Sequence, residues 1–141
     1  MTVPQDTSTI SIIDADEHAV VSVQEMLGGL EAGFSIYCDA ESFLLSVHDG
    51  QPLPACLITE LLLPGLSGLE LFRLLKANEA HVPTVLVTAE ASVPMAVQAI
   101  RAGVADYFLK PLNEPRLRHV VATILGRTAQ QPVSDGGMRR G

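Results

Sequence analysis

Residues 55–68 read ACLITELLLPGLSG, and this stretch decides the fold. The run 55–59 is almost wholly apolar, which is typical of a parallel strand that is covered on both faces. Glu60 ends the run, and a Pro/Gly turn at 64–65 follows. In a chain of alternating strands and helices, a carboxylate placed before such a loop points into a functional crevice. Glu60 is therefore the first candidate site residue.

Working outward, strand and helix patterns alternate five times. The expected strands are 9–13, 34–38, 55–59, 84–88 and 106–109. The expected helices are 40–47, capped by Asp39, then 69–77, 93–101 and 115–125, and a first helix that carries Val20, Val23, Leu27 and Leu30 and stops at Gly33. These units predict an α/β fold: a doubly wound five-stranded parallel sheet of order 2-1-3-4-5 with helices on both faces, the flavodoxin-like arrangement.

Composition limits the class of protein. The 141 residues are 48% hydrophobic and 18% charged, which suits one globular domain. A net charge of −7 argues against nucleic-acid binding by this domain. No apolar stretch reaches the ~18–20 residues that span a bilayer, and no secretory signal is visible. We therefore expect a cytoplasmic protein without membrane contact, with an N-terminal extension at 1–8, a folded domain at 9–125 and a flexible tail at 126–141.

The cysteines and histidines do not predict a metal site. Cys38 and Cys56 both fall in expected strands, and we expect them to be small buried apolar residues. The four histidines show no metal-ligand spacing with the cysteines or with each other. They are expected at the surface or at helix ends.

The strand order 2-1-3-4-5 gathers the carboxyl ends of the first, third, fourth and fifth strands around one crevice. The residues at those ends are Asp14, Glu60, Thr88 and Lys110. The sequence therefore predicts one candidate site at this edge of the sheet.

Four stretches carry a family resemblance: LITELLLPGLSGLEL (57–71), PTVLVTA (83–89), VPMAVQAIRAG (93–103) and DYFLKP (106–111). Together they resemble the receiver domains of bacterial two-component response regulators, in the subgroup attached to transcription factors, over about residues 9–125. The resemblance implies an aspartate that accepts a phosphoryl group from a histidine kinase. It also implies a magnesium ion, held by that aspartate and by two adjacent acids on the first strand, and a hydroxyl and a lysine that contact the phosphoryl group.

Two of the three metal-binding positions are altered here. By the resemblance, Asp14 is the first acid, Ala15 stands in place of the second, and Glu60 stands in place of the phospho-acceptor. The remaining positions match: the hydroxyl is Thr88, the switch aromatic is Tyr107 and the lysine is Lys110.

These substitutions change the net charge of the site and the length of the side chain at residue 60. Three carboxylates and one lysine would leave two excess negative charges, whereas Asp14, Glu60 and Lys110 leave about one, so Lys110 is free to pair with Glu60. We expect no cofactor and weak or absent magnesium binding, with Asp14 the metal ligand if there is one. Glutamate also places its carboxylate about 1.5 Å further out, and a displacement of that size can cost ~100-fold in rate. Phosphorylation of Glu60 is therefore not expected.

Several alternatives stay open at single residues. Asp16 either turns inward through a local bulge or, with Glu17, caps the first helix. Glu60 is a solvated loop acid, a carboxylate that occupies the space of a phosphoryl-aspartate, or the mark of a receiver that signals through protein contacts alone. Lys110 is a structural ion-pair partner or a phosphate contact, and Tyr107 is a switch or a core-edge aromatic.

Two surfaces complete the candidate residues. Leu62 and Glu90 are expected at the rim of the crevice, where leucine makes the mouth more apolar and glutamate adds negative charge. The fourth helix, fifth strand and fifth helix resemble a dimerisation face of the family. Its candidate residues are Val97, Ile100, Arg101, Asp106, Arg116 and Arg118.

We therefore expect a non-enzymatic, phosphorylation-independent receiver that acts through contacts with a histidine kinase or another signalling protein, or by forming a homodimer. One alternative is a phosphorylatable, magnesium-dependent receiver that uses a variant acidic pocket. A distant alternative is a haloacid-dehalogenase-like phosphatase, because Asp14-Ala15-Asp16 matches its DxD motif. That family needs a further acidic pair after the lysine, and only Asn113 and Glu114 follow Lys110.

Overall fold

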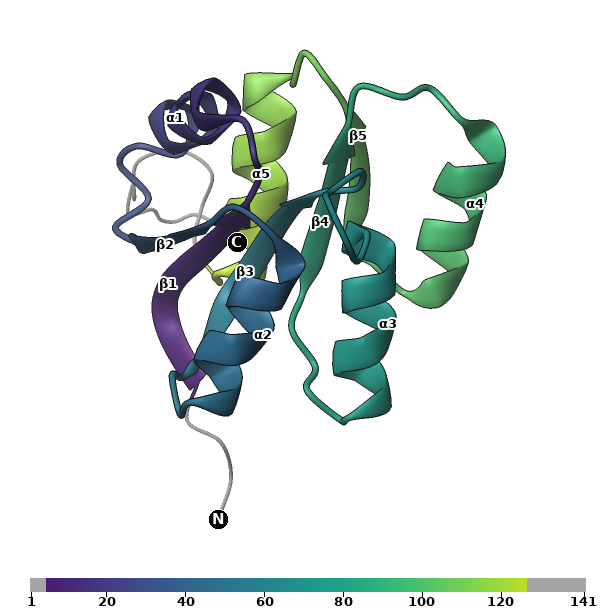
Figure 1. The fold of residues 1–141 in the computed structure, drawn as a ribbon. Coiled ribbons are helices and arrows are strands. Elements are labelled where there is room, and N and C mark those ends of the chain that lie inside the picture. The colour runs from purple at the N-terminus through teal and green to yellow at the C-terminus, as the bar shows by residue number, and fades with distance from the viewer. Residues whose placement is uncertain (1–4, 127–141) are drawn as a thin grey trace.

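The computed structural model describes residues 5–126, which form five strands and five helices (Figure 1). The strands are β1 (Gln5–Ile13), β2 (Gly33–Tyr37), β3 (Leu53–Glu60), β4 (Thr84–Thr88) and β5 (Asp106–Leu109). The helices are α1 (Glu17–Met26), α2 (Ala40–His48), α3 (Gly68–Ala77), α4 (Val93–Ala102) and α5 (Glu114–Ile124). No helix in this range is long and apolar enough to cross a bilayer.

The strands form one parallel sheet in the order β2-β1-β3-β4-β5, which confirms the predicted topology. The order reverses direction beside β1, because β2 lies on one side of β1 and β3, β4 and β5 lie on the other. At such a reversal the connections leave opposite faces of the sheet, and a crevice opens at the carboxyl ends of the strands.

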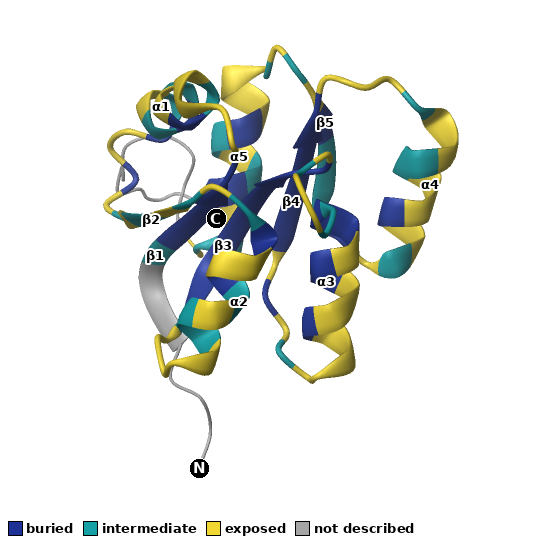
Figure 2. Cartoon of the chain, viewed as in Figure 1, coloured by how far each residue is buried: buried dark blue, intermediate teal, exposed yellow. Residues whose placement is uncertain are grey.

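Successive side chains along each strand point to opposite faces of the sheet, so both faces carry apolar residues. Ile12 and Ile58 pack with the buried residues of α1 and α5, whereas their chain neighbours Ile13 and Leu57 pack with α2 and α3. A third cluster joins β4 to α3 and α4. The central strands are buried along most of their length (Figure 2). Each such side chain contributes about 1.5–3 kcal/mol by leaving water, so the sheet holds the site residues on a rigid support.

Helix ends are fixed by local hydrogen bonds. The carboxylate of Asp39 accepts a hydrogen bond from the Ser42 amide at 2.8 Å, which confirms it as the N-cap of α2. Ser67 and Glu70 form a capping box at the start of α3. Gly103 ends α4 with a φ of 109°, a conformation that glycine adopts without steric cost.

The N-terminal bounds differ from the expectation. Strand β1 begins at Gln5 and not at Thr9, so residues 5–8 belong to the sheet and the extension expected at 1–8 is too long. Pairing with β3 shifts register between Asp6 and Ile10. This irregularity, together with the polar side chains before Thr9, hid the start of the strand. Residues 1–4 and 127–141, which include most of the expected tail, lie outside the described residues.

Two further expectations were wrong. Helix α1 ends at Met26, and Gly33 opens β2 instead of stopping the helix. Leu27 and Leu30 lie in the segment that connects α1 to β2, and both are buried there. Their apolar spacing therefore resembled that of a longer helix. Cys38 follows β2 and is exposed, whereas Cys56 is buried as expected, and burial raises the pKa of its thiol to about 12.

Candidate functional site

The crevice lies where β1, β3, β4 and β5 end. Asp14 directly follows β1, Glu60 is the last residue of β3, Thr88 is the last residue of β4 and Lys110 directly follows β5. Asp14, Glu60 and Thr88 are buried, and the Lys110 side chain is 25% exposed. The strand order therefore places one ammonium, two carboxylates and a hydroxyl at the same edge of the sheet.

Lys110 bridges the two acids. Its Nζ donates to Asp14 Oδ2 at 2.9 Å and to Glu60 Oε1 at 2.7 Å, so the direct pairing with Glu60 expected from the sequence is present. Burial alone would lower the pKa of Lys110, but hydrogen bonds and charge from Glu60 and Asp14 outweigh it, and the pKa is raised. Lys110 is therefore a cation, and the three side chains together carry one net negative charge.

The other carboxylate oxygens are held by the backbone. Asp14 Oδ1 accepts a hydrogen bond from the Asp16 amide at 2.9 Å. Glu60 Oε2 accepts one from the Leu62 amide at 3.0 Å. Each oxygen of both acids thus has a hydrogen-bond donor, and such charge-assisted bonds fix the two carboxylates in place.

Ala15 and Asp16 lie outside this cluster. Ala15 is exposed. Asp16 is the N-cap of α1, where its carboxylate accepts a hydrogen bond from the His18 amide at 2.9 Å, and Glu17 is in the first turn. The capping alternative is confirmed for Asp16, and the inward bulge is wrong, because the Asp16 side chain is 63% exposed. The helix start holds this acid in solvent.

Thr88 and Tyr107 lie on β4 and β5, on the side of α4. The Thr88 hydroxyl accepts a hydrogen bond from the Glu90 amide at 3.2 Å. The Tyr107 hydroxyl is buried, and among the described residues no hydrogen-bond partner is found for it. Burial, then the charges of Glu60 and Glu90, raise the pKa of Tyr107, so the phenol keeps its proton near neutrality. The aromatic ring packs beside the cluster that joins β4 to α3 and α4.

The rim is partly apolar. Leu62 is 57% exposed and Glu90 is exposed, whereas Leu61 is buried. Sequence reasoning missed Glu41 on α2, whose carboxylate accepts a hydrogen bond from the Leu66 amide at 2.9 Å in the loop after β3. No sequence pattern links two residues 25 positions apart in this way. Glu41 therefore ties α2 to the loop that leads away from Glu60.

Some residues of the expected dimerisation face are exposed, and others form hydrogen bonds within the chain. Val97 and Ile100 on α4 are 42% and 53% exposed, and Arg101 is also exposed. Arg116 donates to Asp106 Oδ1 at 2.7 Å, and its guanidinium lies 3.9 Å from the centre of the Phe108 ring. Arg118 instead donates to the carbonyl oxygens of Met26 and Gly28 beside α1.

Residues 10–122 match the model of the response regulator receiver domain. The chain belongs to that family. The matched range includes Asp14-Ala15-Asp16, the segment that also resembles the DxD motif of a phosphatase family. Receivers of this family are signalling modules, in agreement with the expectation from the sequence.

Curated relatives and solved structures agree with this assignment. Transcriptional regulatory protein FixJ of Azorhizobium caulinodans is 33% identical over 123 residues, which are 86% of this chain and 57% of FixJ. Response regulator protein TmoT of Ectopseudomonas mendocina is 32% identical over 88% of this chain and 56% of TmoT. The chain thus spans about half the length of the curated relatives it matches.

Two structures show the same fold. A response regulator receiver protein from Pseudoalteromonas atlantica superposes with a TM-score of 0.75 at 28% identity, over 84% of this chain and 97% of that one. The structure named FixJ-N superposes with a TM-score of 0.72 at 30% identity, over 84% and 93%.

The side chains of this receiver do not fit a magnesium ion. Such an ion needs several oxygen ligands in octahedral geometry. Ala15 offers no side-chain oxygen, and the Lys110 ammonium is bonded to both remaining acids. Within residues 5–126 no three His, Cys, Asp or Glu side chains are grouped to hold a metal. Weak or absent magnesium binding stays a prediction.

Proposed function

We propose that this receiver domain signals without phosphorylation of residue 60. The observation that supports the proposal is the Lys110 bridge, in which one ammonium contacts Asp14 at 2.9 Å and Glu60 at 2.7 Å. Lys110 stands at the lysine position of the family, but here it faces two acids instead of three, so one excess negative charge remains where a complete acidic cluster would leave two. The smaller excess charge weakens the attraction of the crevice for a divalent cation, on which phosphoryl transfer depends.

The geometry of Glu60 gives a second reason. Phosphoryl transfer requires an oxygen aligned with the leaving group and cations that neutralise the developing charge. Both oxygens of Glu60 are held, one by Lys110 and one by the Leu62 amide. The carboxylate also extends about 1.5 Å further from the backbone than that of an aspartate. Attack on a phosphodonor would break these bonds without a metal ion to replace them.

Output is then carried by protein contacts. The α4–β5–α5 face presents exposed apolar side chains, with Val97 at 42% and Ile100 at 53% exposure, beside the ion pair of Arg116 with Asp106. An apolar patch bordered by charges is typical of a protein interface. The partner is a second copy of the chain, a histidine kinase or another signalling protein. The relatives FixJ and TmoT are named a transcriptional regulatory protein and a response regulator, which supports a role for such contacts in gene regulation.

A mass measurement tests the proposal. The protein is incubated with acetyl phosphate and magnesium, and its intact mass is recorded before and after. We expect no added phosphoryl group and weak or absent magnesium binding by calorimetry, because the cluster lacks the acid at position 15 and Lys110 holds the other two. A magnesium-dependent mass gain of one phosphoryl group in the natural chain would falsify the proposal.

The matched control restores the acids. In the double variant Ala15→Asp with Glu60→Asp, a second first-strand acid returns and the carboxylate at residue 60 is drawn back from Lys110. This variant is expected to bind magnesium and to gain the phosphoryl mass under the same conditions. If the double variant stays unmodified, the positions have been assigned wrongly and the result for the natural chain has a different cause.

A further inference from the structure

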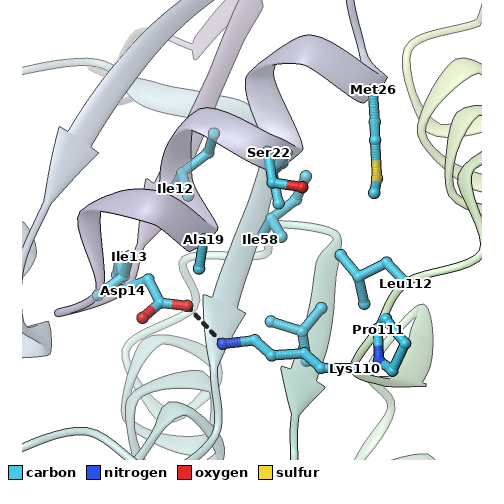
Figure 3. A pocket seen from close by; sticks show the side chains of 12 residues that line it. Ile12, Ile13, Asp14, Ala19, Ser22, Met26, Ile58, Lys110, Pro111 and Leu112 are labelled. Carbon is cyan, nitrogen blue, oxygen red and sulfur yellow. Dashed lines mark hydrogen bonds and ion pairs between the residues drawn. The ribbon is translucent and has the colours of Figure 1, made fainter.

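A cavity of about 170 Å³ lies beside the crevice, between α1 and the sheet (Figure 3). Its walls are mostly apolar and are contributed by Ile12, Val23, Met26, Ile58, Val87 and Leu112. An apolar cavity of about 150 Å³ in another protein is large enough for benzene. The volume here therefore suits one small ring or a short aliphatic chain. The assigned roles of the receiver crevice leave this cavity without a function.

One end of the cavity is charged. Asp14 and Lys110 line it, and Figure 3 shows their ion pair at the end remote from Met26. The Ser22 hydroxyl also lies in the wall. The cavity thus combines an apolar body with a polar end, which is the composition of small-molecule sites.

The sign of the charge at that end favours a cation. Lys110 is shared between Asp14 and Glu60, so the cluster keeps one negative charge. Each oxygen of a carboxylate has two acceptor positions, and the structure uses one on each oxygen of Asp14, for the Asp16 amide and for Lys110. Asp14 can therefore accept another donor without losing those it has. A ligand carboxylate could accept the third N–H of Lys110, which the two acids leave open, but it would add to the excess negative charge of the cluster.

We propose that this cavity binds a small organic amine. The apolar body lies among the aliphatic side chains, and the ammonium donates to Asp14. An uncharged ligand of the same shape has the apolar contacts without the ionic hydrogen bond, and a carboxylate of the same shape meets the excess negative charge. Affinity therefore follows the order amine, alcohol, carboxylate. This order depends on the cavity and on Asp14, and it holds whether or not Glu60 can be phosphorylated.

Three ligands that share one ring test the order. The full chain, labelled with ¹⁵N, is titrated with benzylamine, benzyl alcohol and benzoate at constant pH and ionic strength. Benzylamine is expected to bind at least about 10-fold tighter than benzyl alcohol, a ratio that corresponds to about 1.4 kcal/mol. The largest shifts are expected at the amides of Ala19, Ser22 and Leu112, which line the cavity.

Variants separate the two parts of the site. Asp14→Asn removes the negative charge at nearly constant shape and is expected to abolish the preference for the amine. Ala19→Leu fills the cavity from α1 and is expected to weaken binding of benzylamine and benzyl alcohol alike by about 10-fold or more. Val21→Leu is the matched control, because Val21 is on the same helix but is 51% exposed and does not line the cavity.

The proposal is overturned by any of three results. These are benzoate binding as tightly as benzylamine, benzylamine shifts that persist unchanged in Ala19→Leu, and an absence of benzylamine shifts at tens of millimolar. Circular dichroism establishes that each variant folds. If Asp14→Asn does not fold, the comparison of the three ligands on the natural chain together with Ala19→Leu still decides the matter.

Discussion

Replacing Lys110 by methionine tests whether the ammonium holds the acids together. The substitution keeps the length and the apolar stem of the side chain but removes the charge. Asp14 and Glu60, both buried, then face each other without a counter-ion. We expect the folded domain to lose stability at pH 7, because like charges repel and neither acid can move far from its backbone support.

The structure sets the magnitude. Asp14 Oδ2 and Glu60 Oε1 lie 2.9 Å and 2.7 Å from the same nitrogen, so they are at most 5.6 Å apart, the sum of the two distances. At an effective dielectric constant of about 20, two charges at that separation repel by about 3 kcal/mol. Removal of one partner of a well-buried pair costs ~3–5 kcal/mol, and the 25% exposure of Lys110 reduces that figure through solvent screening. We expect a loss of about 3 kcal/mol.

Urea unfolding followed by circular dichroism measures this loss. The control is Lys76→Met, which removes the same charge from an exposed lysine that donates to the Ala102 carbonyl at 2.8 Å, and it should cost ~0.5–1.5 kcal/mol. The reasoning is refuted if Lys110→Met is as stable as Lys76→Met at pH 7.

Three other predictions concern stability and assembly. The raised pKa of Lys110 means that its charge stabilises the fold below pH 10.5, the ordinary value, and that this contribution is lost as the pH rises through the folded pKa. The free energy of unfolding, measured in urea, should therefore fall more steeply above pH 10.5 for the natural chain than for Lys110→Met. Parallel curves of this free energy against pH would contradict the prediction. Gly65→Ala, at a φ of 79°, should cost ~1–2 kcal/mol through the left-handed backbone and more through its methyl group, which meets the Glu41 carboxylate. Gly50→Ala is the control, because its φ is 99° but open space surrounds it. Equal falls in melting temperature for the two variants would show that the contact with Glu41 adds no cost. Size-exclusion chromatography with light scattering should show self-association that Ile100→Glu reduces, and a monomer at high concentration would exclude the dimer.

Much of the fold was predictable because pattern and packing agree. The strands at 84–88 and 106–109 were located at their observed bounds, since each is a short run enclosed by turn or polar residues. The predicted extent of helix α1 was wrong for a physical reason. Leu27 and Leu30 continue the apolar spacing into a connecting segment that is buried although it is not helical. Periodicity reports burial, and it cannot say which backbone conformation achieves burial.

The site was predictable in its membership but not in its contacts. The order of the strands placed Asp14, Glu60 and Lys110 together, and opposite charge implied a bond between Lys110 and Glu60. The hydrogen bond from the Leu66 amide to Glu41 depends on how α2 lies over a loop 25 residues later, which no local pattern encodes. The apolar cavity depends on the space left between packed side chains, and that space is visible only in three dimensions.

The Lys110 bridge has a consequence for how such a switch receives information. A counter-ion covalently attached to the chain cannot be withdrawn by a chelator or diluted away, so the resting arrangement of the crevice persists through changes in ion supply and energy charge. In a receiver that signals without phosphorylation, as we propose, input arrives as a change in how much of the protein is made or in which molecules occupy its surface. Regulation of this kind follows concentration and competition, and a cell would adjust it on the time scale of synthesis and degradation.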